Sequence, residues 1–244
     1  MNVDLLIYSA ILFLAAVSGG LLVLVRRWSD EHLHFFLSLG AGIFLGAVFI
    51  HLLPESMEAE NPKLIGFLVL AGFLLLFFVE RFLLSRGDGG YDFGHQVIGL
   101  TALIGLSIHA IIDGLGLALA SEDPTHGSVL VISILAHKVP AAFALVSLLR
   151  LAKLPLSRLY ACLGLFSIMT PLGALLLAPL IPNGEREIMV QITGIVTGSF
   201  LYIATCELLP EVFHGRHRQW IKLGLLLAGI AVISYIGSEF SHAH

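Results

Sequence analysis

The sequence predicts an all-α membrane protein, a single transmembrane domain over residues 1–244. Of the 244 residues, 57% are hydrophobic and only 12% are charged, and the mean hydropathy is +0.95. Soluble domains carry about 25% charged residues, so this composition excludes a soluble domain. Only helices and closed barrels satisfy the backbone in lipid, and a spanning helix needs roughly 20 apolar residues. Apolar stretches of that length favour helices.

Eight stretches meet this requirement, and the connections between them are short. No Lys or Arg precedes Arg26, and Asp4 lies where a signal peptide would be basic. We therefore expect the first stretch to be retained rather than cleaved. The eight predicted spans are Leu5–Val25, Phe35–Leu53, Leu64–Leu84, Val97–Ala120, Ser128–Leu149, Leu156–Leu180, Ile188–Leu209 and Ile221–Ile236.

The basic residues divide unevenly between the connections. The even-numbered connections hold only Lys63 and Arg186. Cytoplasmic loops are enriched in Lys and Arg, so we expect the odd-numbered connections to be cytoplasmic and both termini to be outside. The odd-numbered connections hold Arg26, Arg27, Arg81, Arg86, Arg150, Lys153, Arg158, Arg216, Arg218 and Lys222.

The remaining composition limits the partners. The net charge of −4 and the absence of a basic patch give no support for nucleic acid. Cys162 and Cys206 lie in apolar segments and offer no disulfide framework. Small residues such as Gly99, Gly105 and Gly116 suit helix packing within one chain or between chains, so a homodimer stays open. The compact loops suggest a bacterial inner membrane.

An internal repeat relates the second stretch to the seventh. An offset of 156 places Phe44 on Phe200, His51 on Glu207, and the Leu-Leu-Pro-Glu ending at Glu55 on that ending at Glu211. The seventh stretch comes five spans after the second, so the two stretches cross in opposite directions. This pattern predicts an inverted repeat, helices 1–3 and 6–8 around a 4–5 hairpin in a 3+2+3 arrangement, as in many secondary transporters.

The repeat places polar residues near both mouths of the bundle. His51 and Glu55 share one helix face near the outer mouth, and Glu207 and Glu211 share one near the inner mouth. We interpret them as pathway or secondary metal residues. The alternative is that they are ordinary helix-end charges. For Glu55 and Glu211 the two interpretations are about equally good, whereas the pathway interpretation is favoured for His51 and Glu207. Glu80 next to Arg81 is better explained as a structural ion pair.

The fourth and fifth stretches carry the most informative residues. His109 and Asp113 lie one helical turn apart, and His137 and Lys138 stand before Pro140 on the next helix. Ionisable residues within a membrane segment are costly and mark function by default. Two imidazoles and a carboxylate suit zinc or a similar metal. We therefore predict a metal site of His109, Asp113 and His137, with Lys138 balancing the charge of Asp113.

These residues resemble the ZIP (Zrt-, Irt-like) family of divalent metal transporters. The resemblance covers almost the whole chain and rests on His-x-x-x-Asp-Gly from His109, His-Lys-x-Pro from His137, and the Leu-Leu-Pro-Glu helix ends. In that family the fourth and fifth helices hold the transport site, often with two metals bridged by carboxylates. The resemblance implies that His109, Asp113 and His137 are ligands, and that metal moves into the cytoplasm.

Several positions depart from the family pattern. Ala110 stands where the family often has Asn, Lys138 where it often has an acid, and Ala141 at a further ligand position. These changes remove the second metal and resemble the single-site branch of the family. The histidine-rich loop between helices three and four is reduced to His95.

The sequence thus predicts a non-enzymatic, alternating-access transporter of a divalent metal, most simply zinc, with iron, manganese and cadmium open. The metal is cargo, and no cofactor is expected. A cation-diffusion-type exporter is a rival, but it resembles a six-helix bundle with a cytoplasmic domain. An intramembrane zinc hydrolase is another rival, but the chain has no His-Glu-x-x-His or Gly-x-Ser-x-Gly motif. A passive metal channel with the same ligands would differ only in kinetics.

Overall fold

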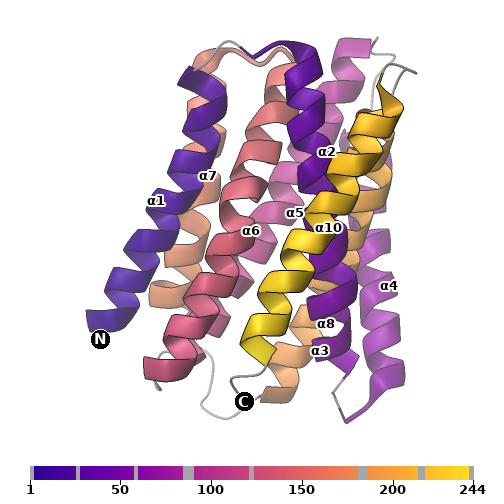
Figure 1. Cartoon of the computed structure of the whole chain (residues 1–244). Helices are drawn as coiled ribbons and strands as arrows, with labels where there is room; N and C mark the ends of the chain where they lie inside the picture. The colour runs from indigo at the N-terminus through magenta and orange to yellow at the C-terminus, as the bar shows by residue number, and fades with distance from the viewer. Residues whose placement is uncertain are drawn as a thin grey trace.

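The computed structural model describes residues 3–25, 28–57, 60–84, 91–120, 124–180, 186–213 and 218–241. Throughout these ranges every regular element is a helix and no strand occurs (Figure 1). Seven helical rods among them are long and apolar enough to cross a membrane: Val3–Val25, Asp30–Leu52, Pro62–Leu84, Val97–Ala118, Leu130–Leu151, Leu156–Leu177 and Val190–Phe213. The apolar part of the last helix, Gln219–Tyr235, is shorter.

Four helices run without a break: α1 (Val3–Val25), α5 (Tyr91–Ala120), α6 (Pro124–Leu151) and α10 (Gln219–Ser241). The others change their hydrogen-bond pattern along the rod. These are α2 (Asp30–Gly46) with η1 (Ala47–Leu52) and α3 (Leu53–Met57), α4 (Pro62–Phe78) with η2 (Val79–Leu84), α7 (Leu156–Leu172) with η3 (Gly173–Leu177) and η4 (Ala178–Leu180), and α8 (Arg186–Tyr202) with η5 (Ile203–Leu208) and α9 (Leu209–Phe213).

Several helices begin earlier than their apolar stretches, because polar caps extend them. α2 begins at Asp30 rather than Phe35, and the side chain of Ser29 accepts a hydrogen bond from the backbone N–H of His32. α4 begins at Pro62, and the Asn61 side chain accepts from the N–H of Leu64 at 3.2 Å. Hydropathy alone finds the apolar span and misses the polar first turn.

The two Leu-Leu-Pro-Glu ends share an unexpected local structure. Each is preceded by a π-helical turn, η1 and η5, and the offset of 156 superimposes the bounds of the two turns. The N–H of Leu53 donates to the carbonyl of Val48, and the N–H of Leu209 donates to that of Ala204. Proline removes one helical donor, and π turns are often found at functional sites. The repeat is therefore structural as well as sequential.

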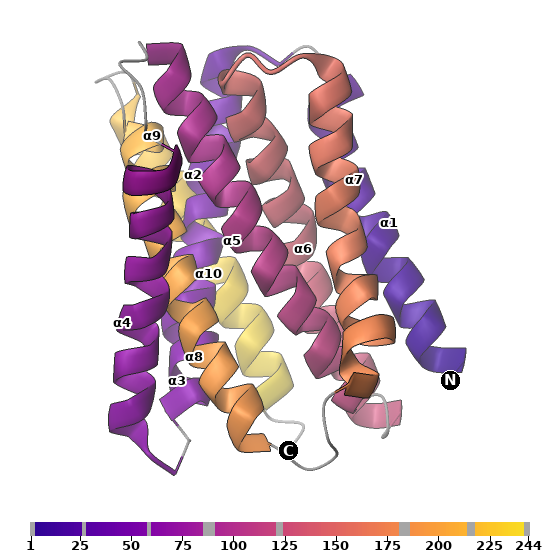
Figure 2. The same cartoon turned by 180° about the vertical axis from the view of Figure 1, so that it is seen from behind.

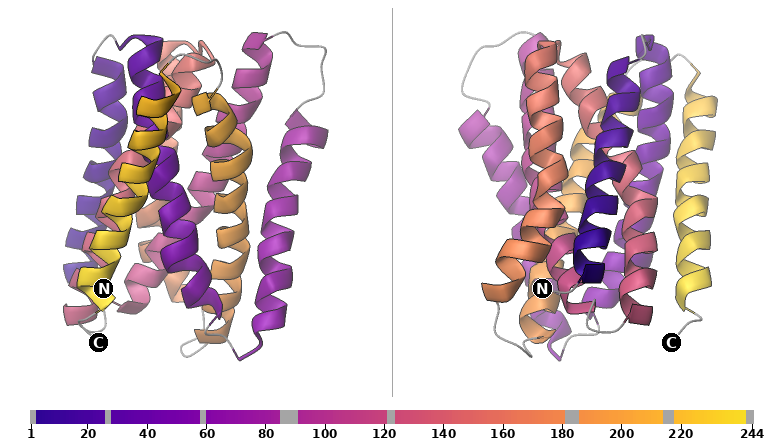
Figure 3. Two further views of the ribbon diagram at one scale, coloured as in Figure 1. Left: turned by 45° about the vertical axis from the view of Figure 1, so that its right-hand side comes forward. Right: turned by 90° about the vertical axis from the view of Figure 1, so that its left-hand side faces the viewer.

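Helix packing follows the same repeat. α2 packs against α10, and α8 packs against α4, as the two views of Figure 3 show. A Cβ added to Gly42 would lie 2.0 Å from the carbonyl oxygen of Leu226, and one added to Gly198 would lie 1.8 Å from that of Val69. The backbones approach this closely only because these two equivalent positions are glycine.

Further close pairs are α1 with α6, α5 with α6 and α5 with α7 (Figure 2). A Cβ on Gly19 would lie 2.5 Å from the carbonyl of Val139, and one on Gly114 would lie 2.2 Å from that of Thr170. α1 begins and α10 ends on the same side of the bundle (Figure 1).

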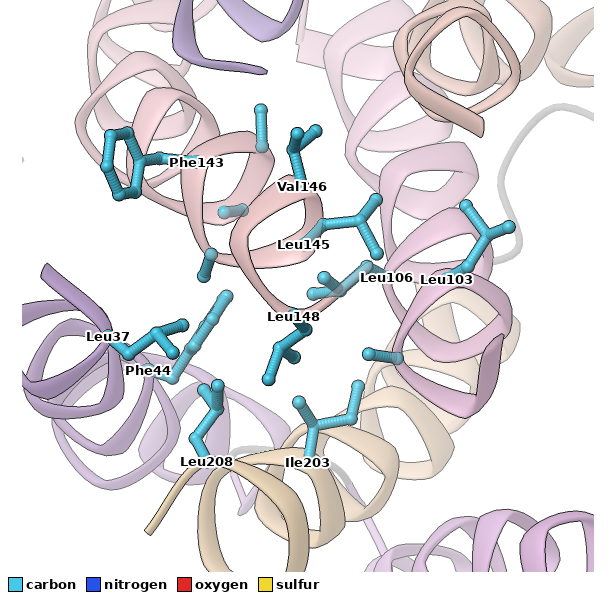
Figure 4. Close-up of a cluster of buried hydrophobic side chains, with 14 of the residues drawn as sticks. Leu37, Phe44, Leu103, Leu106, Phe143, Leu145, Val146, Leu148, Ile203 and Leu208 are labelled. Carbon is cyan, nitrogen blue, oxygen red and sulfur yellow. The ribbon is translucent and has the colours of Figure 1, made fainter. Parts of the chain in front are cut away.

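The main core surrounds α6. Every side chain from Ala141 to Leu149 on this helix is buried. Figure 4 shows Leu145 and Leu148 of α6 between Leu106 of α5, Phe44 of α2 and Leu208 of η5. The central hairpin of α5 and α6 is thus enclosed on several sides, and its polar residues lie deep within the bundle.

Candidate metal centre

The three residues predicted as metal ligands lie together inside the bundle. His109 Nε2 is 3.0 Å from Asp113 Oδ1, and His137 Nε2 is 3.6 Å from Asp113 Oδ2. The two imidazole Nε2 atoms are 3.4 Å apart. The helical turn places the first two on one face of α5, and the antiparallel hairpin brings in α6. Among the described residues these three form the one group of metal-binding side chains found within bonding reach of a common ion.

The distances agree with the geometry of a bound zinc ion. Zinc binds imidazole nitrogen and carboxylate oxygen at about 2.0–2.2 Å, usually as a tetrahedron. Two ligand atoms on such a tetrahedron are about 3.3–3.4 Å apart. The 3.4 Å between the two Nε2 atoms matches this value. The contacts of 3.0 and 3.6 Å reach different oxygens of Asp113, and one ligand atom from each of the three residues lies within 4.8 Å of the other two. Three protein ligands leave a fourth position for water, as in zinc sites that exchange ligands.

Lys138 is held against the same carboxylate. Its ammonium is 3.4 Å from Asp113 Oδ2, donates to Thr170 Oγ1 at 2.5 Å, and lies 4.9 Å from the centre of the Phe166 ring. The side chain is only 1% exposed, so a lysine is buried here with one carboxylate, one hydroxyl and one aromatic face. The ammonium therefore partly neutralises the carboxylate that a cation would use.

An aromatic pair covers the first histidine. The Phe200 ring centre is 4.0 Å from that of His109, and the Phe200 ring also meets the Phe44 ring edge to face at 5.1 Å. Phe44 and Phe200 are equivalent in the repeat, so the two halves of the chain meet beside the metal centre. The Nδ1 atom of His109 is buried and finds no hydrogen-bond partner in the described part of the chain, so packing against Phe200 orients this ring.

None of the pathway residues whose side chains are described belongs to the central group of ligands. His51 Nε2 donates to the carbonyl of Ile233 at 3.3 Å. Glu207 is 1% exposed, and both its carboxylate oxygens are buried with no hydrogen-bond partner among the described residues. Glu211 is 8% exposed and contacts His34. The Glu55 side chain and His95 lie outside the described side chains.

Glu80 has a partner that the sequence did not suggest. Its carboxylate is 3.5 Å from Arg81 Nε, and it also accepts a short hydrogen bond from the Tyr202 hydroxyl. The sequence also did not suggest the contacts of Thr170, Phe200 and His34 with the charged residues. Phe200 was identified as the repeat partner of Phe44 but not as a neighbour of His109. Neither Thr170 nor His34 belongs to a recognisable motif.

Comparison with known proteins decides the family. A family model described as ZIP zinc transporter matches residues 2–92 and 84–237 of the chain. The chain belongs to the ZIP zinc transporter family. This also confirms the resemblance seen in the sequence motifs.

Named relatives in the ZIP family are moderately similar. Zinc transporter ZIP9-B of Xenopus laevis is 27% identical over 254 aligned residues, covering 84% of each chain. Zinc transporter ZIP1 of Homo sapiens is 27% identical and covers 79% of this chain and 74% of its own length. Protein zntD of Dictyostelium discoideum is 33% identical over 140 residues, 55% of this chain and 20% of that protein.

Proposed function

We propose that this ZIP-family protein transports a divalent metal cation, most simply zinc, across a membrane toward the cytoplasm. The observation that carries the proposal is the cluster of His109, Asp113 and His137 at zinc-like spacing inside an apolar bundle. An imidazole–carboxylate set of this kind is expensive to keep among hydrocarbon unless a cation visits it. A fourth coordination position that no protein ligand of this group fills suits an ion that must leave again.

The proposed architecture is eight spans in an inverted repeat. It treats α10 as the eighth span, in addition to the seven long apolar helices. Support comes from the equivalent pairs α2–α10 and α8–α4, from Gly42 and Gly198 at their contacts, and from the matched π turns. Inverted repeats place the substrate near the midplane and exchange access between the two sides. We propose that both termini lie outside, and the excess of Lys and Arg in the odd-numbered connections supports this orientation.

The proposed path joins the centre to both mouths. The cation passes His51 and Glu55, binds the three central ligands, and leaves by Glu207 and Glu211. Glu207 supports this role because its two buried oxygens have no protein partner in the described structure, and an unpaired buried carboxylate is costly. Lys138 occupies the region where relatives with two metals would hold the second, so one central ion is transported at a time.

The remaining features are proposals of the same kind. The whole chain, 1–244, forms one integral domain in a lipid bilayer, with a bacterial inner membrane as the setting. The metal is cargo rather than a cofactor. Gly99 and Gly105 pack on Leu149 and Ile203 within the chain, so neither of these two glycines supports a homodimer. Of the rivals, neither a hydrolase nor an exporter gains support from an observation at the centre.

The test is zinc uptake into liposomes by the purified protein. Wild type should accumulate zinc down a gradient, and His109→Ala and Asp113→Ala should each abolish most of this flux. His32→Ala is a matched control, because His32 lies exposed on α2 away from the centre. Undiminished uptake by both central variants would remove the site, and cleavage of a lipid or peptide without flux would favour the hydrolase.

A further inference from the structure

A histidine that no sequence motif marks faces a carboxylate at the end of the bundle where α2 begins. His34 of α2 and Glu211 of α9 are 177 positions apart in the sequence, yet His34 Nε2 lies 3.2 Å from Glu211 Oε1. The side chains are 19% and 8% exposed, respectively. Two helices that are distant in the chain therefore close on one another through an imidazole and an acid.

The second nitrogen of His34 fixes the state of the first. His34 Nδ1 is 2.6 Å from the backbone carbonyl oxygen of Asp30. A carbonyl can only accept, so the proton of the neutral ring is on Nδ1. Nε2 then presents a lone pair to the carboxylate of Glu211. Two lone pairs at this distance repel, so a positive charge must lie between the two atoms: a proton, which makes the ring an imidazolium, or a metal cation that displaces this proton.

This arrangement is the one by which proteins prepare a histidine ligand. Metal-binding histidines almost always donate their second N–H to a carbonyl or carboxylate, which fixes the tautomer and the ring orientation. The separation of 3.2 Å also matches the edge of about 3.3–3.4 Å expected for two ligands of one tetrahedral zinc ion. His34 meets both conditions, whereas the central His109 has no partner at Nδ1.

A lysine accompanies this pair, as one accompanies the central site. Lys222 of α10 is 5% exposed, and its ammonium donates a hydrogen bond to the carbonyl of Val212 at 2.6 Å. Its positive charge is close enough to His34 to oppose a second positive charge there. At the centre, Lys138 takes the corresponding place beside Asp113. A nearby ammonium weakens the binding of a divalent cation, and a conducting site must release its ion.

We propose that His34 and Glu211 together bind the transported divalent cation at a release site distinct from the central one. The inference rests on the proposed function, and it replaces the Glu207–Glu211 face as the place where Glu211 acts. His34 supplies a neutral nitrogen, Glu211 a charged oxygen, and water the other ligands. Lys222 keeps the affinity low enough for the ion to leave.

The test is the number of zinc ions that the full-length purified protein retains in equilibrium dialysis. His34→Gln should retain one ion fewer per chain than wild type, because loss of a ligand lowers affinity by about 10-fold or more. His137→Ala should also lose one ion, and the double variant should lose both. His32→Gln is the matched control, because His32 lies on the same helix, exposed, with its Nδ1 bonded to Ser29, and it should retain the wild-type number.

A His34→Gln protein that retains the wild-type number, or an equal loss in His32→Gln, would overturn the proposal. If His34→Gln fails to fold, the isosteric Glu211→Gln takes its place in the same measurement. Retention of the central ion, lost only on adding His137→Ala, shows that the variant is folded. If wild type fails to take up zinc into liposomes, the proposed transport function is rejected. The number of bound ions measured by dialysis still tests the His34–Glu211 site on its own.

Discussion

The buried pair of Asp113 and Lys138 predicts that a variant lacking both charges regains stability without regaining transport. Both side chains lie inside the bundle, 8% and 1% exposed, with 3.4 Å between ammonium and carboxylate. Asp113→Asn keeps the shape and removes the charge, so the lysine loses its counterion. Removing one partner of a buried pair costs about 3–5 kcal/mol. We expect the lower end, because Thr170 and the Phe166 ring still contact the ammonium.

A cost of about 3 kcal/mol lowers Tm by about 6–12 °C in a chain of this length. The double variant Asp113→Asn with Lys138→Met removes both charges and should recover most of that loss, a coupling of about 2–3 kcal/mol. Zinc uptake should stay absent in both, because a ligand is missing. The assay is thermal unfolding in detergent beside liposome uptake. An unchanged Tm in Asp113→Asn, or no recovery in the double variant, would refute the buried-pair reasoning.

Three further predictions concern single positions. Lys138→Met alone should raise zinc affinity by about 10-fold in calorimetry, because repulsion of a divalent ion about 5 Å away is about 1.7 kcal/mol even at the dielectric of water. Gly198→Ala should lower stability by about 1–3 kcal/mol in thermal unfolding, because its Cβ would lie 1.8 Å from a carbonyl oxygen, whereas Gly224→Ala meets nothing within 4 Å and should be neutral or stabilising. Tyr202→Phe should cost about 1.5–3 kcal/mol by removing a buried bond to a carboxylate, whereas the exposed Tyr160→Phe should change stability by less than about 0.5 kcal/mol.

Each of these has a contradicting outcome. Weaker zinc binding in Lys138→Met would show that the ammonium supports the metal site. Equal effects at Gly198 and Gly224 would show that backbone contact does not set the α4–α8 distance. A Tyr202→Phe protein as stable as Tyr160→Phe would remove the phenol from any role in holding its carboxylate.

The sequence predicted most of the helical scaffold because its signals are local. Apolar length marks the spans, and spacing of one turn places His109 and Asp113 on one face. His137 followed from the hairpin, since two consecutive antiparallel helices meet side by side. The repeat predicted that Gly42 and Gly198 are equivalent, and the structure adds that both make the same kind of backbone contact.

The parts that sequence missed depend on distant contacts. His34 meets Glu211 only through the packing of α2 against α9, and Thr170 reaches Lys138 only through α7. The π turns were also missed, because an interior proline predicts a broken or freed hydrogen bond but not how the helix absorbs it. Helix starts were placed late because hydropathy ignores capping residues such as Ser29.

The most direct test of the account is the position of a bound zinc ion, found by anomalous diffraction at the zinc edge from crystals of the full-length protein. The account predicts a peak about 2.0–2.2 Å from His109, Asp113 and His137 together, with a further ligand from solvent. A zinc peak that none of these three residues touches, in a protein that still takes up zinc into liposomes, would contradict it.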